Sequence, residues 1–402
     1  MKLKLACLFT ILSVGVHLYL TNHFHTVQMG SADGKSTCNI SDTFNCDAVA
    51  ASDYSTIAGI PIAAFGVTTN LVILILLGLV LLRLTEIPEK ALRAAFWLSA
   101  FSLLASAVMG VISLTQLTTY CLYCIVLYIF SVFIFFLIRG SAKKLEFKLG
   151  LSELMNDIKS YIKAPVWPVV LALSIPAFAF FINKGIEGNN IEGSSKDFER
   201  LVSSSIQDWQ NGTVHKFDTP ASLIKGKDSA SAKITVVEFA DFRCGHCQKA
   251  SGPLSTFANS HSDVQLHFYN FPLDGACNEK IPNSNGVSCR LAKAVHCGNA
   301  QDFGWAFHDV IFANQKSFFT VGSSDGVDKK LKSLITEFSP DWTKLSTCMD
   351  SAETHQAIKK QAELGVRVGV QGTPKIYMNG KALPAGQFLP VLKKARSIVL
   401  GN

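Results

Sequence analysis

Two C-x-x-C motifs stand out among the eleven cysteines of this 402-residue chain, Cys121 to Cys124 and Cys244 to Cys247. Two thiols at this spacing at the start of a helix lie within bonding reach across its first turn, and the helix N-terminus stabilises a thiolate there. A third pair, Cys38 and Cys46, flanks a mostly polar segment. The thiolate of one such pair can attack a disulfide of another. The cysteines therefore predict redox chemistry, provided that they face an oxidising compartment.

Five apolar spans that could hold these cysteines at a membrane precede the second motif. A helix needs about 20 mostly apolar residues to cross the hydrocarbon core, and residues 3–20, 61–82, 94–138 and 166–182 fit this pattern. Residues 94–138 carry no charged side chain and are long enough for two spans, divided near residues 115–119. Residues 3–20 also resemble a signal peptide, but no small-x-small cleavage site follows them, so we expect a retained span.

Lysine and arginine are distributed unevenly around these spans, and such residues collect in cytoplasmic loops. With the N-terminus in the cytoplasm, the inner segments before the fifth span carry eleven Lys and Arg, whereas the outer loops carry only Lys35. This orientation places every cysteine except Cys7 on the outer, oxidising side, where disulfides are favoured over zinc sites. We therefore expect a multi-pass protein of the bacterial cytoplasmic membrane whose second half lies outside the cytoplasm.

The composition agrees with this division. Hydrophobic residues make up 49% of the chain and charged residues 17%, and the mean hydropathy is +0.28. These values argue against a disordered or wholly soluble chain. The charged residues are concentrated from residue 184 onward, as in a soluble domain. The net charge of +7 is spread without a stripe of Lys and Arg, so we expect no nucleic-acid partner.

Short motifs in residues 1–140 follow the order seen in one membrane family. Between the loop cysteines and the first C-x-x-C motif lie Ser52-Asp53-Tyr54-Ser55, Gly59-Ile60-Pro61 and Phe65-Gly66. In order and spacing this segment resembles vitamin K epoxide reductase homologues. The resemblance implies a four-helix transmembrane bundle that holds a quinone, ubiquinone or menaquinone, at its outer end.

The same resemblance implies a role for each cysteine of the first half. Cys124 would react with the quinone, and Cys121 would be its partner. Cys38 and Cys46 would form a shuttle pair that carries electrons to them. The residues that flank Cys121 and Cys124 are apolar or aromatic, which suits a quinone ring.

The second half contains a strand followed by a redox motif. Residues 234–239 are β-branched and apolar, and the C-G-H-C motif and a helical run follow them, which is the thioredoxin-like arrangement. At the helix N-terminus Cys244 should have a lowered pKa, helped by His246, and Cys247 should be the resolving thiol. Glu238, on the strand beneath, is either the acceptor of the Cys247 proton or an ordinary strand glutamate at a solvent edge.

Residues 369–380 resemble the cis-proline loop of the thioredoxin fold, with Thr373 before Pro374. A cis bond would place the Thr373 backbone beside Cys244, ready to pair with a substrate strand, whereas a trans turn proline is the alternative. A long and mostly helical insertion precedes this loop. With the C-x-x-C motif, the insertion makes residues 215–400 resemble the DsbA-like branch of that fold.

Four further cysteines of the second half allow three pairings. Cys277 and Cys289 flank a loop rich in Pro, Asn and Gly, so we pair them, which leaves Cys297 with Cys348. Both bonds would be structural.

The predicted fold is a membrane all-α four-helix bundle with a fifth transmembrane helix, followed by a soluble α/β thioredoxin-like domain with a helical insertion. We place the bundle at residues 1–140 and the DsbA-like domain at residues 206–402. Residues 141–205 would hold a cytoplasmic segment, the fifth span and a linker.

The predicted function is a quinone-dependent thiol oxidase that forms disulfides in exported proteins. Electrons would pass from substrate thiols through the C-G-H-C motif, the loop pair and the membrane C-x-x-C motif to the quinone. One alternative is a disulfide isomerase or reductase that uses the same pairs in the opposite direction. Another is a thiolate metal-binding membrane protein, which we disfavour because the two C-x-x-C motifs lie far apart in the sequence; we expect no metal.

Overall fold

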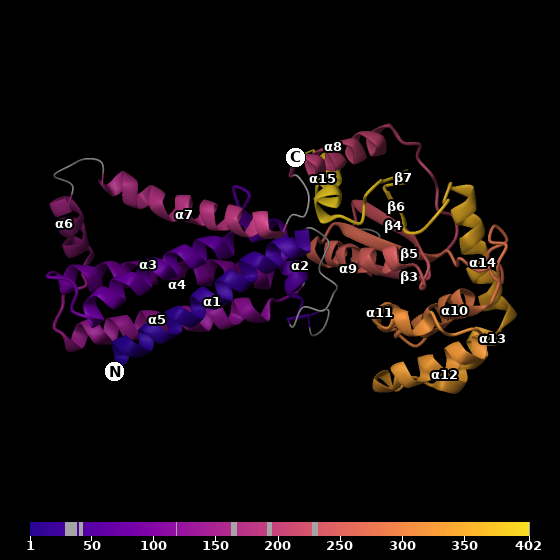
Figure 1. Cartoon of the computed structure of the whole chain (residues 1–402), viewed down its shortest axis with the longest axis horizontal. Helices are drawn as coiled ribbons and strands as arrows, with labels where there is room; N and C mark the ends of the chain where they lie inside the picture. Colours follow the sequence, from indigo (N-terminus) through magenta and orange to yellow (C-terminus); the bar gives the residue numbers. More distant parts are fainter. Residues whose placement is uncertain are drawn as a thin grey trace. The chain divides into compact units, whose positions relative to one another are not determined.

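The computed structural model describes residues 1–28, 38–39, 43–117, 119–161, 167–190, 195–226 and 232–401. Side chains are described over these ranges except at 159–161, 167–173, 187–190 and 195–196. The chain divides into two compact units, one mainly up to Glu192 and the other mainly from Gly193 (Figure 1).

Among the described residues, the first unit contains four helices that are long and apolar enough to cross a membrane, and they coincide with the first four predicted spans. They run side by side in Figure 1 and are α1 (Lys2–Gln28), α3 (Ile62–Leu81), α4 (Pro88–Thr115) and α5 (Leu122–Lys144). Their most apolar windows have a mean hydropathy of 1.8 to 2.4. A short α2 (Cys46–Ala51) and the strands β1 (Thr56–Ile57) and β2 (Ile60–Pro61) connect α1 to α3.

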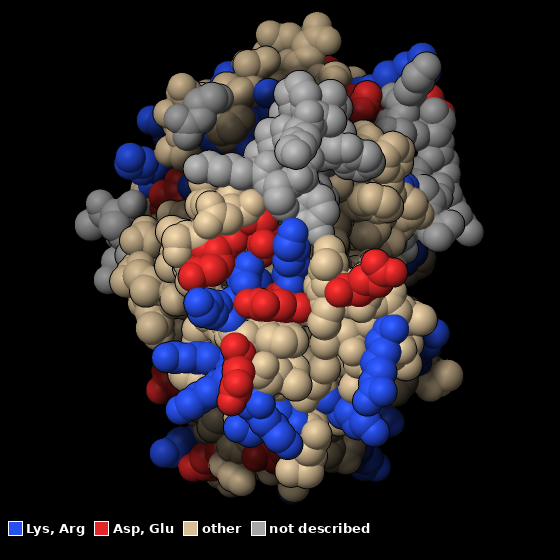
Figure 2. Space-filling model, turned by 90° about the vertical axis from the view of Figure 1, so that its left-hand side faces the viewer, with Lys and Arg blue, Asp and Glu red and all other residues tan. Residues whose placement is uncertain are grey.

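Two further helices complete this unit. The first, α6 (Leu151–Tyr161), is held to α4 by an ion pair between Arg93 and Asp157, and Arg93 also pairs with Glu89 within α4. The second, α7 (Trp167–Asn190), packs along α3 and coincides with the predicted fifth span, of which residue 166 lies outside the described residues. Lys and Arg side chains gather on the end of the unit that carries α6, the end that the sequence assigns to the cytoplasm (Figure 2).

The second unit has a five-stranded sheet in the order β3-β5-β4-β6-β7. The strands are β3 (Leu223–Gly226), β4 (Ile234–Ala240), β5 (Val264–Asn270), β6 (Lys375–Met378) and β7 (Lys381–Ala382). Strands β4 and β5 are parallel and the other neighbours are antiparallel. The redox motif follows β4, whose seven residues are nearly all buried, and leads into α9 (Gly245–Ser260). This is the predicted thioredoxin-like arrangement.

Helices of the predicted insertion lie between β5 and β6 and share one apolar core with the start of α9. They are α10 (Val287–Asn299), α11 (Gly304–Ala313), α12 (Ser324–Leu334) and α13 (Trp342–Asp350), with the short helical turns η2 (Gln315–Phe318) and η3 (Thr336–Phe338). Next along the chain, α14 (Ala352–Arg367) covers the face of the sheet that carries Phe239, and α15 (Leu389–Leu400) ends the chain.

Helix α8 (Ser195–Asn211), which includes the predicted boundary at residue 205, belongs to the second unit because its buried face docks on the sheet. Trp209 is 5% exposed and its Nε1 donates a hydrogen bond to the Met378 carbonyl at 3.0 Å. Phe198 packs edge-on against Phe388 near the start of α15.

Candidate functional site

Four cysteine sulfurs form a continuous series in the first unit. Cys38 and Cys46 are joined by a disulfide, with Cα atoms 5.6 Å apart. The Cys46 sulfur lies 3.3 Å from that of Cys121, which lies 2.7 Å from that of Cys124. Cys38, Cys46 and Cys121 are each at most 3% exposed. The structure thus brings together the loop pair and the membrane pair that the sequence singled out.

Backbone pairing between two distant segments creates this series. The Asn45 amide donates to the Tyr120 carbonyl at 3.0 Å, and the Tyr120 amide donates to the Thr43 carbonyl at 2.8 Å. Cys46 then begins α2, and Cys121 caps α5 by accepting a hydrogen bond from the Cys124 amide on its sulfur at 3.2 Å. The two helix starts therefore face each other with a cysteine at each.

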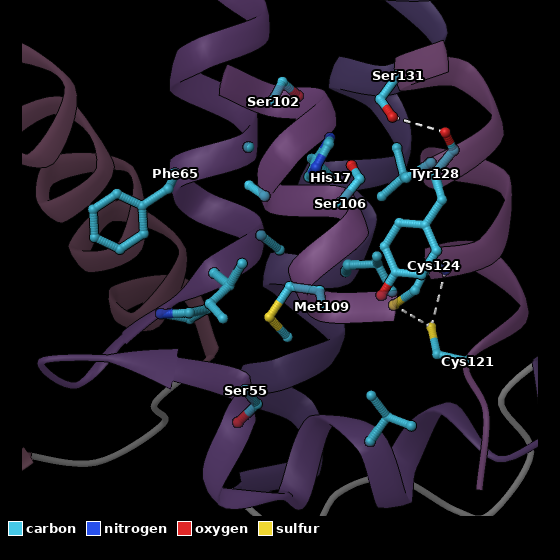
Figure 3. A pocket seen from close by; sticks show the side chains of 18 of the residues that line it. His17, Ser55, Phe65, Ser102, Ser106, Met109, Cys121, Cys124, Tyr128 and Ser131 are labelled. Atoms are coloured by element: carbon cyan, nitrogen blue, oxygen red, sulfur yellow. Dashed lines mark hydrogen bonds between the residues drawn. The ribbon is translucent and has the colours of Figure 1, made fainter. Parts of the chain in front are cut away.

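A cavity of about 210 Å³ opens beside the membrane pair. Its wall is mainly apolar and includes Phe65, Met109 and Leu127, with Cys121 and Cys124 among the lining residues. In Figure 3 the ring of Tyr128 lies next to the Cys124 side chain.

In the second unit Cys244 caps α9, and its half-buried sulfur accepts a hydrogen bond from the Cys247 amide at 3.4 Å. The Cys247 thiol and neighbouring backbone amides lower the pKa of Cys244 to about 6, against the opposing effect of burial. Burial, together with the Cys244 sulfur, raises the pKa of Cys247 well above its usual value. Such a pair has one reactive thiolate and one resolving thiol.

His246 acts differently from the expectation. Its side chain is exposed, and it is its backbone N–H that adds, after the larger effect of the Cys247 thiol, to the lowered pKa of Cys244. The lowered pKa of Cys244, which was expected to depend partly on the imidazole, is therefore explained by groups in the first turn of α9.

Glu238 is a buried acid, not the solvent-edge glutamate of the alternative interpretation. It is 1% exposed and lies in the central strand β4, on the face opposite Phe239. Burial and then the charge of Cys244 raise its pKa to about 8. Its Oε1 has no hydrogen-bond partner among the residues that the structure describes.

The Thr373–Pro374 bond is cis, in the loop before β6. The Cys244 thiol donates a hydrogen bond to the Thr373 carbonyl at 3.3 Å. The loop therefore presents backbone groups directly beside the reactive sulfur, where an extended substrate can pair with them.

Two family models match the chain. Residues 4–138 match the vitamin K epoxide reductase family, and residues 235–396 match the DSBA-like thioredoxin domain. The chain joins a vitamin K epoxide reductase domain to a DsbA-like domain. It is accordingly an oxidoreductase that acts on thiols.

Several known proteins are similar to less than half of this chain. Probable disulfide bond formation protein D of Bacillus anthracis is 28% identical over 202 residues, which are 48% of this chain and 86% of that protein. Disulfide bond formation protein D of Bacillus subtilis is 24% identical over 165 residues, which are 40% and 68% of the two chains. The crystal structure of oxidised BdbD from Bacillus subtilis matches with 20% identity and a TM-score of 0.38, over 48% of this chain and 98% of that one.

The cavity of the reductase domain fits a quinone ring. A quinone needs an apolar slot with a few hydrogen-bond donors for its carbonyls. The lining includes the donors Asn70 and Tyr128 as well as the imidazole of His17. When bound, a quinone would supply an acceptor of two electrons and two protons beside Cys124.

The DsbA-like domain holds two more disulfides. Cys277 is joined to Cys289 and Cys297 to Cys348, the pairs that the sequence suggested. His355 Nδ1 lies 3.9 Å from the Cys277 sulfur.

Two side chains that position these sites escaped the sequence analysis. Gln315, in η2, is 2% exposed and its Nε2 donates to the carbonyls of Phe242 and Cys244 at 3.0 and 2.9 Å. Asn39 accepts hydrogen bonds on Oδ1 from the amides of Cys46 and Asp47, at 2.9 and 3.4 Å. Their signals in the sequence are weak, because a glutamine in a helical turn is common and Asn39 is conspicuous only as a neighbour of Cys38.

Proposed function

We propose that this protein is a quinone-linked thiol oxidase that forms disulfides in exported proteins. The observation that carries the proposal is the series of sulfurs from Cys46 through Cys121 to Cys124, which ends at the cavity. The relatives named disulfide bond formation protein D support it. We also propose that the N-terminus lies in the cytoplasm and the DsbA-like domain outside it.

The DsbA-like domain takes electrons from the substrate in two exchanges. A substrate thiolate attacks Cys244 of the Cys244–Cys247 disulfide, which forms a mixed disulfide and releases Cys247. The second substrate thiolate then attacks the substrate sulfur of this mixed disulfide, so that the substrate leaves with a disulfide and the domain keeps two reduced cysteines. Glu238 takes up or releases the proton that Cys247 exchanges.

The reductase domain passes these two electrons onward. The reduced DsbA-like domain reduces the Cys38–Cys46 disulfide. The Cys46 thiolate then attacks Cys121 of the Cys121–Cys124 disulfide and displaces Cys124 as a thiolate. Cys38 next attacks Cys46, which restores the loop disulfide and leaves Cys121 reduced. Because the two domains belong to one chain, the first of these transfers is intramolecular and is favoured by a high effective concentration.

The lowered pKa of Cys244 favours the oxidase over the reverse, isomerase or reductase, direction. A stable thiolate stabilises the reduced form of the pair, so its disulfide is a stronger oxidant. The direction can be tested separately, since an enzyme that runs in reverse would reduce an oxidised peptide when it is supplied with quinol.

The test is quinone reduction by the full chain in lipid nanodiscs, driven by a reduced dithiol peptide. Cys124→Ala should abolish quinone reduction, and Cys38→Ala should leave the Cys244–Cys247 pair reduced and unable to pass its electrons on. Cys7→Ala is the matched control, because Cys7 lies apart from the sulfur series on α1, and it should retain the parent rate. Quinone reduction at the parent rate by Cys124→Ala would refute the relay.

A further inference from the structure

A buried ion pair lies beside the loop disulfide. His23 Nε2, near the end of α1, is 2.8 Å from Asp47 Oδ1 in α2, and the two side chains are 9% and 4% exposed. Asp47 directly follows Cys46. The pair therefore connects the first transmembrane helix to the segment that holds the Cys46 sulfur against Cys121.

The place of Asp47 relative to Cys46 is fixed from both sides. Asn39 Oδ1 accepts hydrogen bonds from the amides of both residues, and Asn45 caps the same helix through the Ala48 amide at 2.9 Å. Asp47 thus holds its carboxylate in the first turn of α2, one residue from the exchanging sulfur.

The imidazole of His23 contacts Tyr19, which in turn contacts the membrane C-x-x-C motif. The Tyr19 ring stacks on it, with the ring planes 4° apart and the centroids 5.8 Å apart. Tyr19 also meets Tyr123 edge-on at 5.1 Å, and Tyr123 lies between Cys121 and Cys124. The His23–Asp47 pair therefore lies in the buried contact between the loop cysteine pair and the membrane cysteine pair, and not on the exposed surface.

A carboxylate in this position opposes the chemistry of Cys46 unless its charge is balanced. Exchange requires a thiolate at Cys46, and a like charge nearby in a buried setting disfavours it. A buried carboxylate without a partner would also be costly in itself. The imidazole of His23, with Nε2 2.8 Å from Asp47 Oδ1, is the group placed to balance this charge.

We propose that His23 is a positioning residue that keeps the loop disulfide reducible by neutralising Asp47 beside Cys46. The inference rests on the proposed function, in which the loop pair must be reduced and reoxidised in every cycle. The proposed role of His23 is electrostatic, and experiment can distinguish it from a purely mechanical connection between α1 and α2. A mechanical connection would be broken equally by changing either partner, whereas a charge balance is restored by removing both.

The test is the dithiol–disulfide equilibrium of Cys38 and Cys46. It is measured in the full chain in nanodiscs, with Cys121, Cys124, Cys244 and Cys247 changed to Ser, against graded buffers of reduced and oxidised dithiothreitol. Peptide mapping by mass spectrometry reads the state of the loop pair directly. Quinone and substrate are absent from this measurement, so it does not depend on whether the relay operates. A failure of the proposed function can therefore be distinguished from a failure of the proposed role of His23.

His23→Gln leaves Asp47 without its partner and should shift the equilibrium toward the disulfide by about tenfold. Asp47→Asn should not shift it in that direction. The double variant removes both charges and should return to within about threefold of the parent, given the usual scatter of coupled pairs. His23→Lys places a positive charge at this position, so its dithiol–disulfide equilibrium should lie near that of the parent. This variant also provides a test if His23→Gln does not fold.

Two results would overturn the proposal. One is an unchanged equilibrium in His23→Gln, or a shift in His23→Lys as large as that in His23→Gln. The other is a shift toward the disulfide of the same size in both single variants that persists in the double variant, which would mean that the pair only connects the helices.

Discussion

The sulfur of Cys46 lies 3.3 Å from the sulfur of Cys121, although the two residues are 75 positions apart in the chain. The contact depends on the backbone pairing of Asn45 with Tyr120, which sets the start of α2 against the start of α5. In the proposed relay, this contact makes Cys46 the cysteine of the loop pair that exchanges with the membrane pair. Cys124 is then the cysteine displaced toward the cavity.

This contact predicts a specific trapped intermediate. In Cys38→Ser/Cys124→Ser the two resolving thiols are absent, so added oxidised glutathione, which is itself reduced, should join Cys46 and Cys121 in a stable disulfide. In the matched variant Cys46→Ser/Cys124→Ser, a Cys38–Cys121 bond should form in at most a small fraction of molecules. Non-reducing peptide mapping of the full chain distinguishes the two bonds. Equal amounts of both bonds would show that the loop presents either cysteine and that the observed contact does not direct the exchange.

The pKa of about 6 predicts how the reactivity of Cys244 depends on pH. In the reduced chain, the rate of alkylation of Cys244 by iodoacetamide should be half-maximal near pH 6, since the thiolate is the nucleophile. Because this pKa is lowered from 9.0 on folding, the thiolate's contribution to the stability of the reduced domain is complete above pH 9 and is lost as the pH falls from 9 through 6.

The Cys247 thiol is the largest cause of this lowered pKa, so Cys247→Ala should move the midpoint upward, toward the ordinary value of 9.0. Peptide-resolved alkylation rates between pH 4 and pH 10 measure both midpoints. A parent midpoint near pH 9 would contradict the prediction and would also weaken the case for the oxidase direction.

Glu238 predicts a pH dependence of the opposite sign. Its pKa is raised to about 8 in the folded protein, so the folded state binds its proton more tightly than the unfolded state between about pH 5 and pH 8. The stability of the oxidised domain should therefore fall as the pH rises through this range. In Glu238→Gln a slope of up to about 1 kcal/mol per pH unit should disappear.

Pulse proteolysis of the oxidised full chain in urea, at pH 5, 6.5 and 8, measures this slope. Glu337→Gln serves as the control, because Glu337 is exposed in the same domain and the change should leave the slope as it is. If the slopes of the parent and Glu238→Gln are the same, the buried carboxyl is not the group that titrates.

The apolar spans and the strand–motif–helix order are local patterns, which is why they predicted the bundle and the thioredoxin-like sheet. The predicted third span started at residue 94 because Arg93 and its neighbours are charged, yet α4 begins at Pro88. Arg93 is 5% exposed and is satisfied by Glu89, Asp157 and the Lys148 carbonyl. Hydropathy does not register Asp157 and Lys148 as partners, because they come from another part of the chain.

In the candidate site, too, local sequence patterns predicted some features and contacts between distant residues determine the others. The sequence identified all three redox pairs but treated Cys38 and Cys46 alike, because their difference arises from the pairing of Asn45 with Tyr120. It attributed the thiolate of Cys244 to the helix N-terminus and to His246, whereas the largest cause of the lowered pKa is the Cys247 thiol. Residue types predicted the chemistry, and only long-range contacts determine which atom carries it out.

Gln315 gives a final prediction, about a residue with no chemistry of its own. Its amide satisfies two carbonyls of the active-site loop, so Gln315→Ala should leave them buried and unpaired and cost the domain about 1–3 kcal/mol. Gln315→Glu places an oxygen where the donor was and should cost more at pH 7, despite its closer shape. Pulse proteolysis in urea measures both losses, with Gln301→Ala as the control, because Gln301 bonds to Asp341 on the exposed side of the same insertion and should cost less. Equal stability of Gln315→Glu and the parent would show that these hydrogen bonds do not hold the loop.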